Sequence, residues 1–371
     1  MRILYVTTIS LTMNTFFKPH IEMLIQNGNQ VDIACNYMEL PLDSLYKILC
    51  GKIYQIDFSR KPLSISNMKA YKQLEKVVEN GDYDIVHCHT PNAAVITRLV
   101  CRKFRKENGL RVFYTAHGFH FYKGASLLNW LVFYPIEKLC SRFTDKLITI
   151  NKEDYELAKK KFEAKEVHYV PGVGIDLSKF QDIQVDRYAK RCEIGVPENA
   201  FLLLSVGELN ENKNHQIVIQ AMARLRNPNL HYAIAGVGVQ KEYLLNLSKK
   251  LGVAEQVHLL GYRKDIPELN YIADVFCFPS IREGLPVALI EAMACNLIII
   301  AADNRGSRDI IENGKNGFLC KAGSVEDFVT AITTALNNTD VVREMIQYTN
   351  GSVSKFDIEF IKKRIRDLYT V

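Results

Sequence analysis

Two glutamates, Glu283 and Glu291, stand eight positions apart in the segment 282–291, Arg-Glu-Gly-Leu-Pro-Val-Ala-Leu-Ile-Glu. The glycine and the proline predict a turn that leads into a helix, with Pro286 in the first helical turn, where its missing amide hydrogen costs nothing. The positive end of the helix dipole and the free amides there form a seat for a phosphate. These amides belong to Gly284, Leu285 and Val287. The segment therefore predicts a phosphate site bracketed by two carboxylates.

A second segment, 206–213, reads Val-Gly-Glu-Leu-Asn-Glu-Asn-Lys and follows a predicted strand. Gly207 allows the backbone to turn tightly, and Lys213 just beyond it can reach a diphosphate as a point charge. The alternative is an ordinary solvated lysine at the start of a helix.

Histidines mark a third region, in the first half of the chain. The segment 114–120, Tyr-Thr-Ala-His-Gly-Phe-His, places His117 and His120 after a predicted strand, where parallel sheets carry their active-site loops. We expect His120 to pack or to cap. His87 and His89 share a strand face at ligand-like spacing, but no carboxylate or cysteine pattern completes a metal site. A structural role for His87, a cleft-edge position for His89 and no bound metal are therefore expected.

The framework behind these segments alternates short apolar runs with helical stretches, as in a mostly parallel sheet flanked by helices. In the first half, strands are predicted at 3–7, 31–35, 53–57, 85–88, 112–116, 147–150 and 167–170. A second series is predicted at 201–206, 231–235, 257–259, 275–278, 297–301 and 318–320.

The chain has 371 residues, more than one hydrophobic core usually organises, so two domains are expected. The polar stretch 178–199 is the candidate linker. We place the first Rossmann-like domain at 1–177, the second at 178–354 and a terminal helix at 355–371.

Taken together, these segments resemble the retaining glycosyltransferases of family 4, in the subgroup similar to capsular and exopolysaccharide enzymes. The resemblance covers nearly the whole chain. It implies an α/β fold of the GT-B type, in which two Rossmann-like domains face each other across a cleft and a C-terminal helix crosses back to the first domain.

The resemblance also implies roles for residues. Glu283 meets hydroxyls of the donor sugar, Glu291 holds the ribose and His117 lies beside the reacting sugar. The implied catalytic residues are His117, Glu283 and Lys213. The segment 261–266 borders the nucleotide base. The implied donor-binding residues are Gly207, Lys213, Tyr262, Arg263, Arg282, Glu283, Gly284, Leu285, Pro286, Val287 and Glu291.

Two positions depart from the family pattern. An arginine usually follows the glycine of the second segment, whereas this chain has Glu208. Lys213 is then the clear cation of this loop, and Arg282, beside Glu283, is the candidate to compensate. The first loop, 7–14, lacks the paired glycines of many members, and its Thr and Ser hydroxyls are expected to take their place.

The implied function is retaining transfer of a hexose or N-acetylhexosamine from a nucleotide diphosphate, expected to be UDP, to a lipid-linked saccharide in bacterial surface polysaccharide synthesis. We expect same-face attack without a metal or other cofactor. One alternative is a sugar-nucleotide 2-epimerase of the same fold, which would turn over UDP-GlcNAc without acceptor. Another is a catalytically silent partner subunit that binds a nucleotide-sugar, which Glu208 and the absent glycine pair favour.

Composition and charge indicate the cellular compartment of the protein and the partners that it binds. The nine scattered cysteines predict free thiols in a reducing cytosol. Residues 1–175 carry a net charge of +7 and residues 176–371 carry −1. The basic stretch 98–111 and the apolar segment 126–134, which contains the only tryptophan, Trp130, suit an anionic membrane face with a polyprenyl-diphosphate-linked acceptor. The alternative is a solvated helix face and a buried helix. We expect a peripheral protein on the cytoplasmic side of the plasma membrane, with no nucleic-acid partner.

Overall fold

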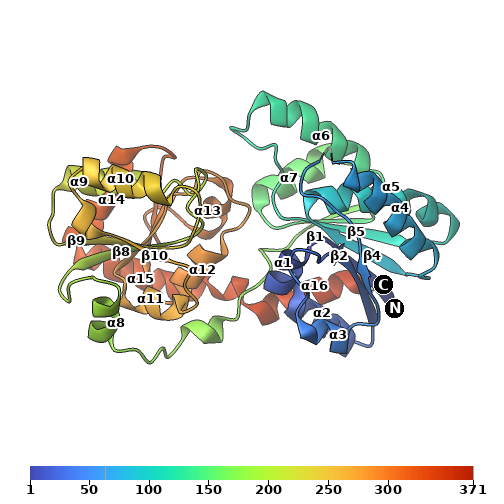
Figure 1. Cartoon of the computed structure of the whole chain (residues 1–371), viewed down its shortest axis with the longest axis horizontal. Coiled ribbons are helices and arrows are strands. Elements are labelled where there is room, and N and C mark those ends of the chain that lie inside the picture. The colour runs from blue at the N-terminus through green and yellow to red at the C-terminus, as the bar shows by residue number, and fades with distance from the viewer. Residues whose placement is uncertain (63, 371) are drawn as a thin grey trace. The chain divides into compact units, whose positions relative to one another are not determined.

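The computed structural model describes residues 1–62 and 64–370 and forms two compact units (Figure 1). Unit 1 comprises Met1–Gly174 together with the chain from Ile358 onward, and unit 2 comprises Ile175–Asp357. These divisions differ from the predicted ones at 177 and 354, because Ile175 pairs with Asp357 in a parallel bridge at the base of unit 2. The two places where the chain passes between the units are therefore tied together by backbone.

Within the described residues, unit 1 contains a parallel sheet of seven strands in the order β3-β2-β1-β4-β5-β6-β7. The strands are β1 Arg2–Ile9, β2 Gln30–Asn36, β3 Ile53–Gln55, β4 Ile85–His89, β5 Arg111–Ala116, β6 Lys146–Thr149 and β7 Glu166–Tyr169. The helices are α1 Ser10–Thr12, α2 Lys18–Gln26, α3 Ser44–Leu49, α4 Ser66–Glu79, α5 Pro91–Glu107, α6 Leu127–Ser141, α7 Lys152–Lys161 and α16 Ile358–Tyr369. Each predicted strand of the first half is confirmed, with ends displaced by up to two residues.

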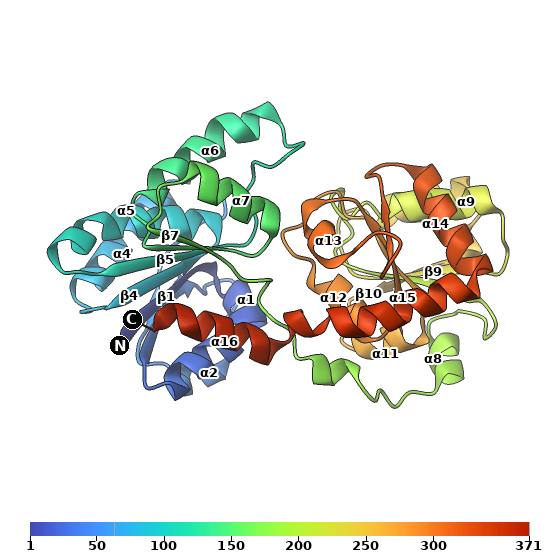
Figure 2. The ribbon, with the colours of Figure 1, turned by 180° about the vertical axis from the view of Figure 1, so that it is seen from behind.

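Helices cover both faces of this sheet: α4 to α7 lie on one face, and α2, α3 and α16 lie on the other (Figure 1). The terminal helix α16 runs beside α2 (Figure 2). Ile361, Ile365 and Leu368 recur at helical spacing and are buried in the core that α16 shares with α2. The prediction that the terminal helix returns to the first domain is confirmed.

Unit 2 contains, in the described residues, a parallel sheet of six strands in the order β10-β9-β8-β11-β12-β13. The strands are β8 Phe201–Val206, β9 Leu230–Ala235, β10 Val257–Gly261, β11 Val275–Phe278, β12 Ile298–Ala302 and β13 Phe318–Cys320. The helices are α8 Arg187–Glu193, α9 Gln216–Leu225, α10 Lys241–Lys250, α11 Ile266–Ile272, α12 Val287–Ala294, α13 Arg305–Ile310, α14 Val325–Asn337 and α15 Thr339–Ser352. All strands predicted for the second half are confirmed.

The polar stretch 178–199 is not a free linker, and that prediction is wrong. It contains α8, whose Arg191 is buried and donates hydrogen bonds to the carbonyl of Ala200 at 2.7 Å and that of Ile272 at 2.8 Å. Arg191 also pairs with Asp274 at 2.8 Å. Because a buried guanidinium needs all of its donors satisfied, this polar residue anchors the stretch in unit 2.

Both sheets reverse their strand order at one point, between β1 and β4 in unit 1 and between β8 and β11 in unit 2. In open parallel sheets, ligands bind outside the carboxyl ends of the strands at such a switch point. The loops that follow these four strands are therefore where a site is expected, and they contain most of the residues that the sequence singled out.

Candidate active site

Lys213 and Glu283 form an ion pair in unit 2, with 2.8 Å between Nζ and Oε1. Lys213 ends the loop that follows β8, and Glu283 lies in the loop that follows β11, so each comes from one side of the switch point. Both side chains are partly exposed, at 22% and 17%. The ammonium also lies 5.0 Å from the centre of the Phe278 ring. Two residues 70 positions apart in the chain are thus held at one place on the sheet edge.

Backbone and amide contacts hold these two loops against each other. The side chain of Asn210 accepts a hydrogen bond from the amide of Lys213 at 2.9 Å. Asn212 donates from its side chain to the carbonyl of Arg282 at 3.0 Å, and its own carbonyl accepts from the amide of Ile281 at 2.8 Å. The positions of Lys213 and Glu283 are therefore set by their loops as well as by their mutual attraction.

Glycines make this approach possible. A Cβ added to Gly236 would lie 1.9 Å from the carbonyl oxygen of Gly207, and one added to Gly238 would lie 2.4 Å from that of Leu209. The Gly-x-Gly fragment after β9 therefore allows the backbone of the 207–209 loop to pack directly on it. At Gly207 itself, an added Cβ would lie 3.2 Å from Cε of Lys213, so the glycine leaves room for the lysine stem.

The helix predicted between the two glutamates is α12, but its start differs from the prediction. Pro286 is the residue before the first turn, with φ −79° and ψ 109°, and the helix begins at Val287. The Pro286 ring packs closely on the start of α13, where a Cβ on Gly306 would lie 3.0 Å from Cδ of Pro286. The first turn of α12 still presents amides that have no carbonyl partner within the helix, and these amides can bind an anion.

Glu291 lies one turn into α12 and is partly buried. Burial raises the pKa of its carboxyl above the ordinary value. Among the described residues, no side chain forms a hydrogen bond or an ion pair with this carboxylate. Glu291 is therefore available to accept hydrogen bonds from hydroxyl groups of a ligand.

Among the other residues predicted to bind the donor, the polar side chains are exposed or pair with surface carboxylates. The side chains of Arg282 and Glu208 are exposed, and Tyr262 is 73% exposed. Arg263 pairs with Asp265 and, at 2.6 Å, with Glu193. Its guanidinium therefore belongs to a surface ion-pair network.

In unit 1, His117 is partly buried and joins a cluster of buried rings at the carboxyl ends of β4 and β5. Its Nε2 lies 3.2 Å from Nδ1 of His89, at hydrogen-bonding distance. The His89 ring stacks on Tyr5, with 4.6 Å between centroids, and lies 4.2 Å from the His87 ring. His87 in turn bonds to the hydroxyl of Tyr369 on α16. The cluster thus connects the terminal helix to the loop that carries His117.

Burial keeps these imidazoles neutral. Desolvation lowers the pKa of His117 to about 4 and that of His87 to about 3, and neighbouring histidines add to the effect. The pKa of His89 is lowered as well. The structural role predicted for His87 is confirmed, whereas the edge position predicted for His89 is wrong: His89 is only 2% exposed, because Tyr5 and Phe17 enclose it.

His120 packs as predicted, with its ring stacked on Phe133 at a centroid distance of 4.8 Å. Within residues 1–62 and 64–370, no cluster of three or more His, Cys, Asp or Glu side chains suits a metal ion.

Comparison with known proteins identifies the family. The model of "Glycosyl transferase 4-like" domains matches residues 2–151, and that of "Glycosyl transferases group 1" matches residues 186–351. EpsD of Bacillus subtilis (strain 168), which its name assigns to the glycosyltransferases, is 36% identical over 374 residues, covering 100% of this chain and 96% of EpsD. The chain belongs to the family 4-type glycosyltransferases.

Two further comparisons place this glycosyltransferase among related proteins. The Escherichia coli UDP-Gal:alpha-D-GlcNAc-diphosphoundecaprenol alpha-1,3-galactosyltransferase is 28% identical over 312 residues, covering 82% of this chain and 80% of that enzyme. The crystal structure of Anabaena HepE in complex with UDP-glucose has a TM-score of 0.78 and 20% identity, with 99% of each chain covered. The second comparison supports the GT-B fold of the glycosyltransferase.

The glycosyltransferase has site residues that the sequence analysis missed. Arg305 donates from Nε to the carbonyl of Glu283 at 3.2 Å, and a Cβ on Gly306 would lie 2.8 Å from the carbonyl oxygen of Gly284. Asn304 donates to the carbonyl of Ser280 at 2.8 Å. These residues support the turn that carries Glu283. Their position directly after the predicted strand 297–301 was the available signal, since active-site loops follow parallel strands.

The basic stretch 98–111 and the apolar segment 126–134, which were expected to suit a membrane face, also differ from that prediction. Arg98 is 1% exposed and pairs with Glu137 at 2.8 Å, so it is no part of a surface patch. Trp130 packs against the core of unit 1 and donates to the carbonyl of Tyr122 at 3.3 Å. The exposed apolar residues of α6 are instead Val132, Ile136 and several leucines, including Leu128 and Leu131 at 68% and 74%. Among the described residues, no helix has the length and apolar character that crossing a bilayer requires.

Proposed function

We propose that this glycosyltransferase transfers a hexose or N-acetylhexosamine from a UDP-sugar to a polyprenyl-diphosphate-linked saccharide, with retention of anomeric configuration. The pathway we propose is synthesis of a bacterial surface polysaccharide. The observation that carries the proposal is the meeting of Lys213, Glu283 and the start of α12 at the switch point of unit 2.

In the proposed donor complex, the diphosphate binds at the first turn of α12 and Lys213. Negative charge grows on the diphosphate as the bond to the sugar breaks, so a fixed ammonium and helix amides favour the transition state over the ground state. Glu283 accepts hydrogen bonds from the sugar hydroxyls, and Glu291 accepts them from the ribose. The backbone at Tyr262 and Arg263 borders the base.

The proposed chemistry is a same-face displacement. The bond between the anomeric carbon and the diphosphate oxygen breaks, an acceptor hydroxyl oxygen bonds to that carbon from the same face, and its proton passes to the leaving phosphate. His117, neutral at pH 7, is suited to hydrogen-bonding a sugar hydroxyl rather than to acting as an acid. No metal is required, because Lys213 and the helix start supply the positive charge.

Relatives support the acceptor class. Besides the E. coli galactosyltransferase, the Campylobacter jejuni N,N'-diacetylbacillosaminyl-diphospho-undecaprenol alpha-1,3-N-acetylgalactosaminyltransferase is 25% identical over 329 residues. The names of both relatives include an undecaprenyl diphosphate carrier. We propose that the exposed leucines of α6 bring unit 1 to the cytoplasmic membrane face, where such carriers reside.

The first test is a thermal-shift screen of UDP-, GDP- and dTDP-sugars, because a ligand that binds the native state raises the melting temperature. A UDP-sugar that stabilises the protein is then incubated with undecaprenyl-diphosphate-linked GlcNAc, and the anomeric configuration of the product is determined by NMR. We expect an α-linked product from an α-linked donor, at a rate unchanged by EDTA.

Other results would contradict specific parts of the proposal. Stabilisation by GDP- or dTDP-sugars alone would overturn the donor assignment. Inversion of configuration would overturn the mechanism, and loss of activity in EDTA would overturn the metal-free reaction. Turnover of UDP-GlcNAc to its 2-epimer without acceptor would instead support the epimerase alternative.

A further inference from the structure

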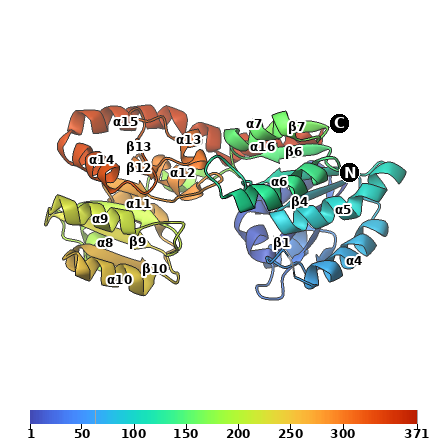
Figure 3. The same ribbon diagram turned by 90° about the horizontal axis from the view of Figure 1, so that it is seen from above.

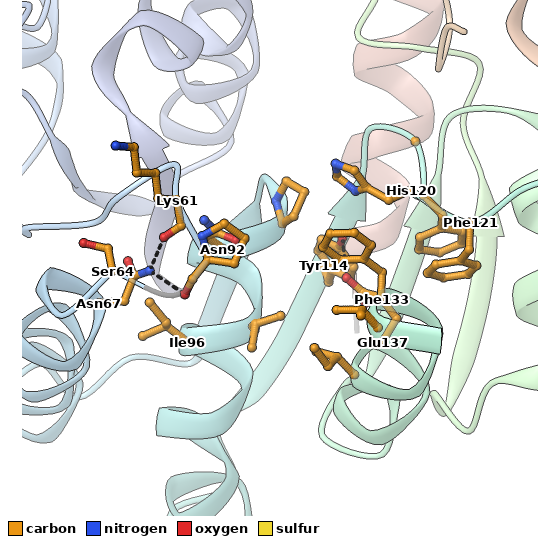
Figure 4. Close-up of a pocket in the computed structure, with 17 residues that line it drawn as sticks. Lys61, Ser64, Asn67, Asn92, Ile96, Tyr114, His120, Phe121, Phe133 and Glu137 are labelled. Carbon is orange, nitrogen blue, oxygen red and sulfur yellow. Dashed lines mark hydrogen bonds between the residues drawn. The ribbon is translucent and has the colours of Figure 1, made fainter. Parts of the chain in front are cut away.

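Unit 1 contains an apolar cavity of about 670 Å³ between α5 and α6. The two helices lie side by side on one face of the sheet (Figure 3). Ile96 of α5, Ser64 and Asn67 form one wall, and Phe133, Phe121 and His120 form the other (Figure 4). The volume is within the range of about 300–1,000 Å³ that small-molecule sites occupy.

The charges at the base of this cavity cancel. Glu137 lines it but pairs with buried Arg98 at 2.8 Å, and the hydroxyl of Tyr114 donates to its other oxygen at 3.3 Å. The Arg98 guanidinium also lies 4.1 Å from the centre of the Tyr114 ring. Because the carboxylate is neutralised inside the protein, the cavity is suited to hydrocarbon rather than to a cation.

A second cavity of about 530 Å³ adjoins the first, since five described residues line both. The shared residues are Pro62, Pro91, Asn92, His120 and Phe133. The second cavity is more polar: it is also lined by Thr8 and Thr90, which follow the β1 and β4 sides of the switch point, and by Arg60. None of the described residues that line it is acidic. An apolar cavity thus opens beside a polar one at the ligand-binding edge of the sheet.

Two neighbouring exposed cations belong to the chain that borders both cavities. Arg60 lines the polar cavity and Lys61 the apolar one, and among the described residues neither forms an ion pair. Their loop is held in place, because Asn67 donates to the carbonyl of Lys61 at 3.0 Å and Asn92 donates to that of Ser59 at 2.8 Å. A fixed loop with unpaired cations favours an anion at this junction.

We propose that the two cavities bind the polyprenyl diphosphate of the acceptor: the apolar cavity takes the first isoprenoid units, and Arg60 and Lys61 bind the diphosphate. Hydrocarbon walls, a pair of cations and an adjacent polar cavity match the three parts of such a molecule in order, with the saccharide toward Thr8 and Thr90. This inference rests on the proposed function, which it deepens by assigning the acceptor site.

Trp130 provides a direct test, because it is the only tryptophan and its ring lies 5.5 Å from Phe121, which lines the apolar cavity. The full chain is titrated with farnesyl diphosphate, farnesol and inorganic pyrophosphate, and Trp130 fluorescence is followed. We expect farnesyl diphosphate to bind at least about tenfold more tightly than either fragment, since it uses both halves of the site.

Paired variants test the apolar cavity and the two cations separately. Val132→Phe fills the apolar cavity, and Ile48→Phe, at an exposed position on α3 that lines neither cavity, is its control. We expect Val132→Phe to weaken farnesyl diphosphate binding about tenfold without changing pyrophosphate binding. Arg60→Ala with Lys61→Ala should weaken both diphosphates about tenfold, whereas Arg102→Ala with Lys103→Ala, exposed on α5, should leave them unchanged.

Three results would overturn the inference. Pyrophosphate binding as tightly as farnesyl diphosphate would show that the apolar cavity contributes nothing. Equal competition by phosphatidylglycerol would show a site for ordinary acyl chains. Unchanged sugar transfer by the Val132→Phe and Arg60/Lys61 variants at limiting acceptor would place the acceptor elsewhere. A protein that binds farnesyl diphosphate as expected but transfers no sugar would contradict the proposed function instead.

Discussion

The ammonium of Lys213 lies 2.8 Å from the carboxylate of Glu283 and joins the two loops at the switch point of the second sheet. Each residue was a separate candidate in the sequence, one for the diphosphate and one for the sugar. Their pairing means that each holds the other in place before a donor binds. In the proposed reaction, such a preorganised cation requires little rearrangement when the phosphates gain charge.

Lys213→Met tests that role, since methionine keeps the length of the side chain and removes its charge. We expect kcat for transfer to fall about 10²–10³-fold, as for other single groups that stabilise transition-state charge. The melting temperature should change little, because a partly exposed ion pair contributes only about 0–1 kcal/mol. Lys241→Met, at an exposed position in α10, is the control. An unchanged kcat would exclude Lys213 from the chemistry.

Glu208→Arg tests whether the exposed glutamate limits donor binding. Reversing its charge should lower the Kd for UDP about three- to tenfold, because one charge near a surface anion is worth about 1 kcal/mol. The gain should shrink in 0.5 M NaCl, where screening extends over about 4 Å. Glu211→Arg, exposed in the same loop, is the comparison. Equal effects of the two variants would mean that only the net charge of the loop matters.

Glu291→Gln tests the assignment of the ribose. A hydrogen bond to a carboxylate contributes about 1.5–3 kcal/mol, so UDP binding measured by calorimetry should weaken about 10–100-fold. The 2′,3′-dideoxy analogue of UDP should bind wild type and variant equally, because it has no hydroxyls for the carboxylate. If the variant weakened both ligands to the same extent, Glu291 would act on the helix rather than on the ribose.

The histidine cluster predicts a stability that depends on pH. His20 of α2 is also buried beside this cluster, next to Phe17. The folded pKa values of His20 and His117 are about 4 and that of His87 is about 3, below the unfolded value of about 6.5. The unfolded chain therefore binds more protons between these values, and the free energy of unfolding falls as the pH decreases from about 6.5 toward 4. Thermal unfolding between pH 7.5 and 4.5 should show this loss.

A substitution in the cluster sharpens that test. His89→Phe keeps a ring between Tyr5 and Phe17 and removes one buried titrating group, so the melting temperature should fall less steeply with acidification. His168→Phe, on the outer strand β7 of the same unit, is the control. An identical pH profile for wild type and His89→Phe would show that acid acts elsewhere.

The fold was predictable because it depends on local patterns. Most strands of both sheets are short apolar runs, and a parallel sheet buried on both faces requires such runs. The terminal helix was predictable for a similar reason, since Ile361, Ile365 and Leu368 form one apolar stripe. The prediction of a linker at 178–199 was wrong because burial of Arg191 depends on distant carbonyls that no local pattern reveals.

By itself, the sequence determined the two parallel sheets, the terminal helix and the loops that carry the candidate site residues, because strand patterns and turn residues act over a few neighbours. Only the tertiary structure decided which side chains meet. It brought Lys213 to Glu283 over 70 positions, enclosed His89 among aromatic rings and paired Arg98 with Glu137 beneath an apolar cavity. Such contacts depend on how strands order themselves in a sheet and how helices pack on it, and that information is spread over the whole chain.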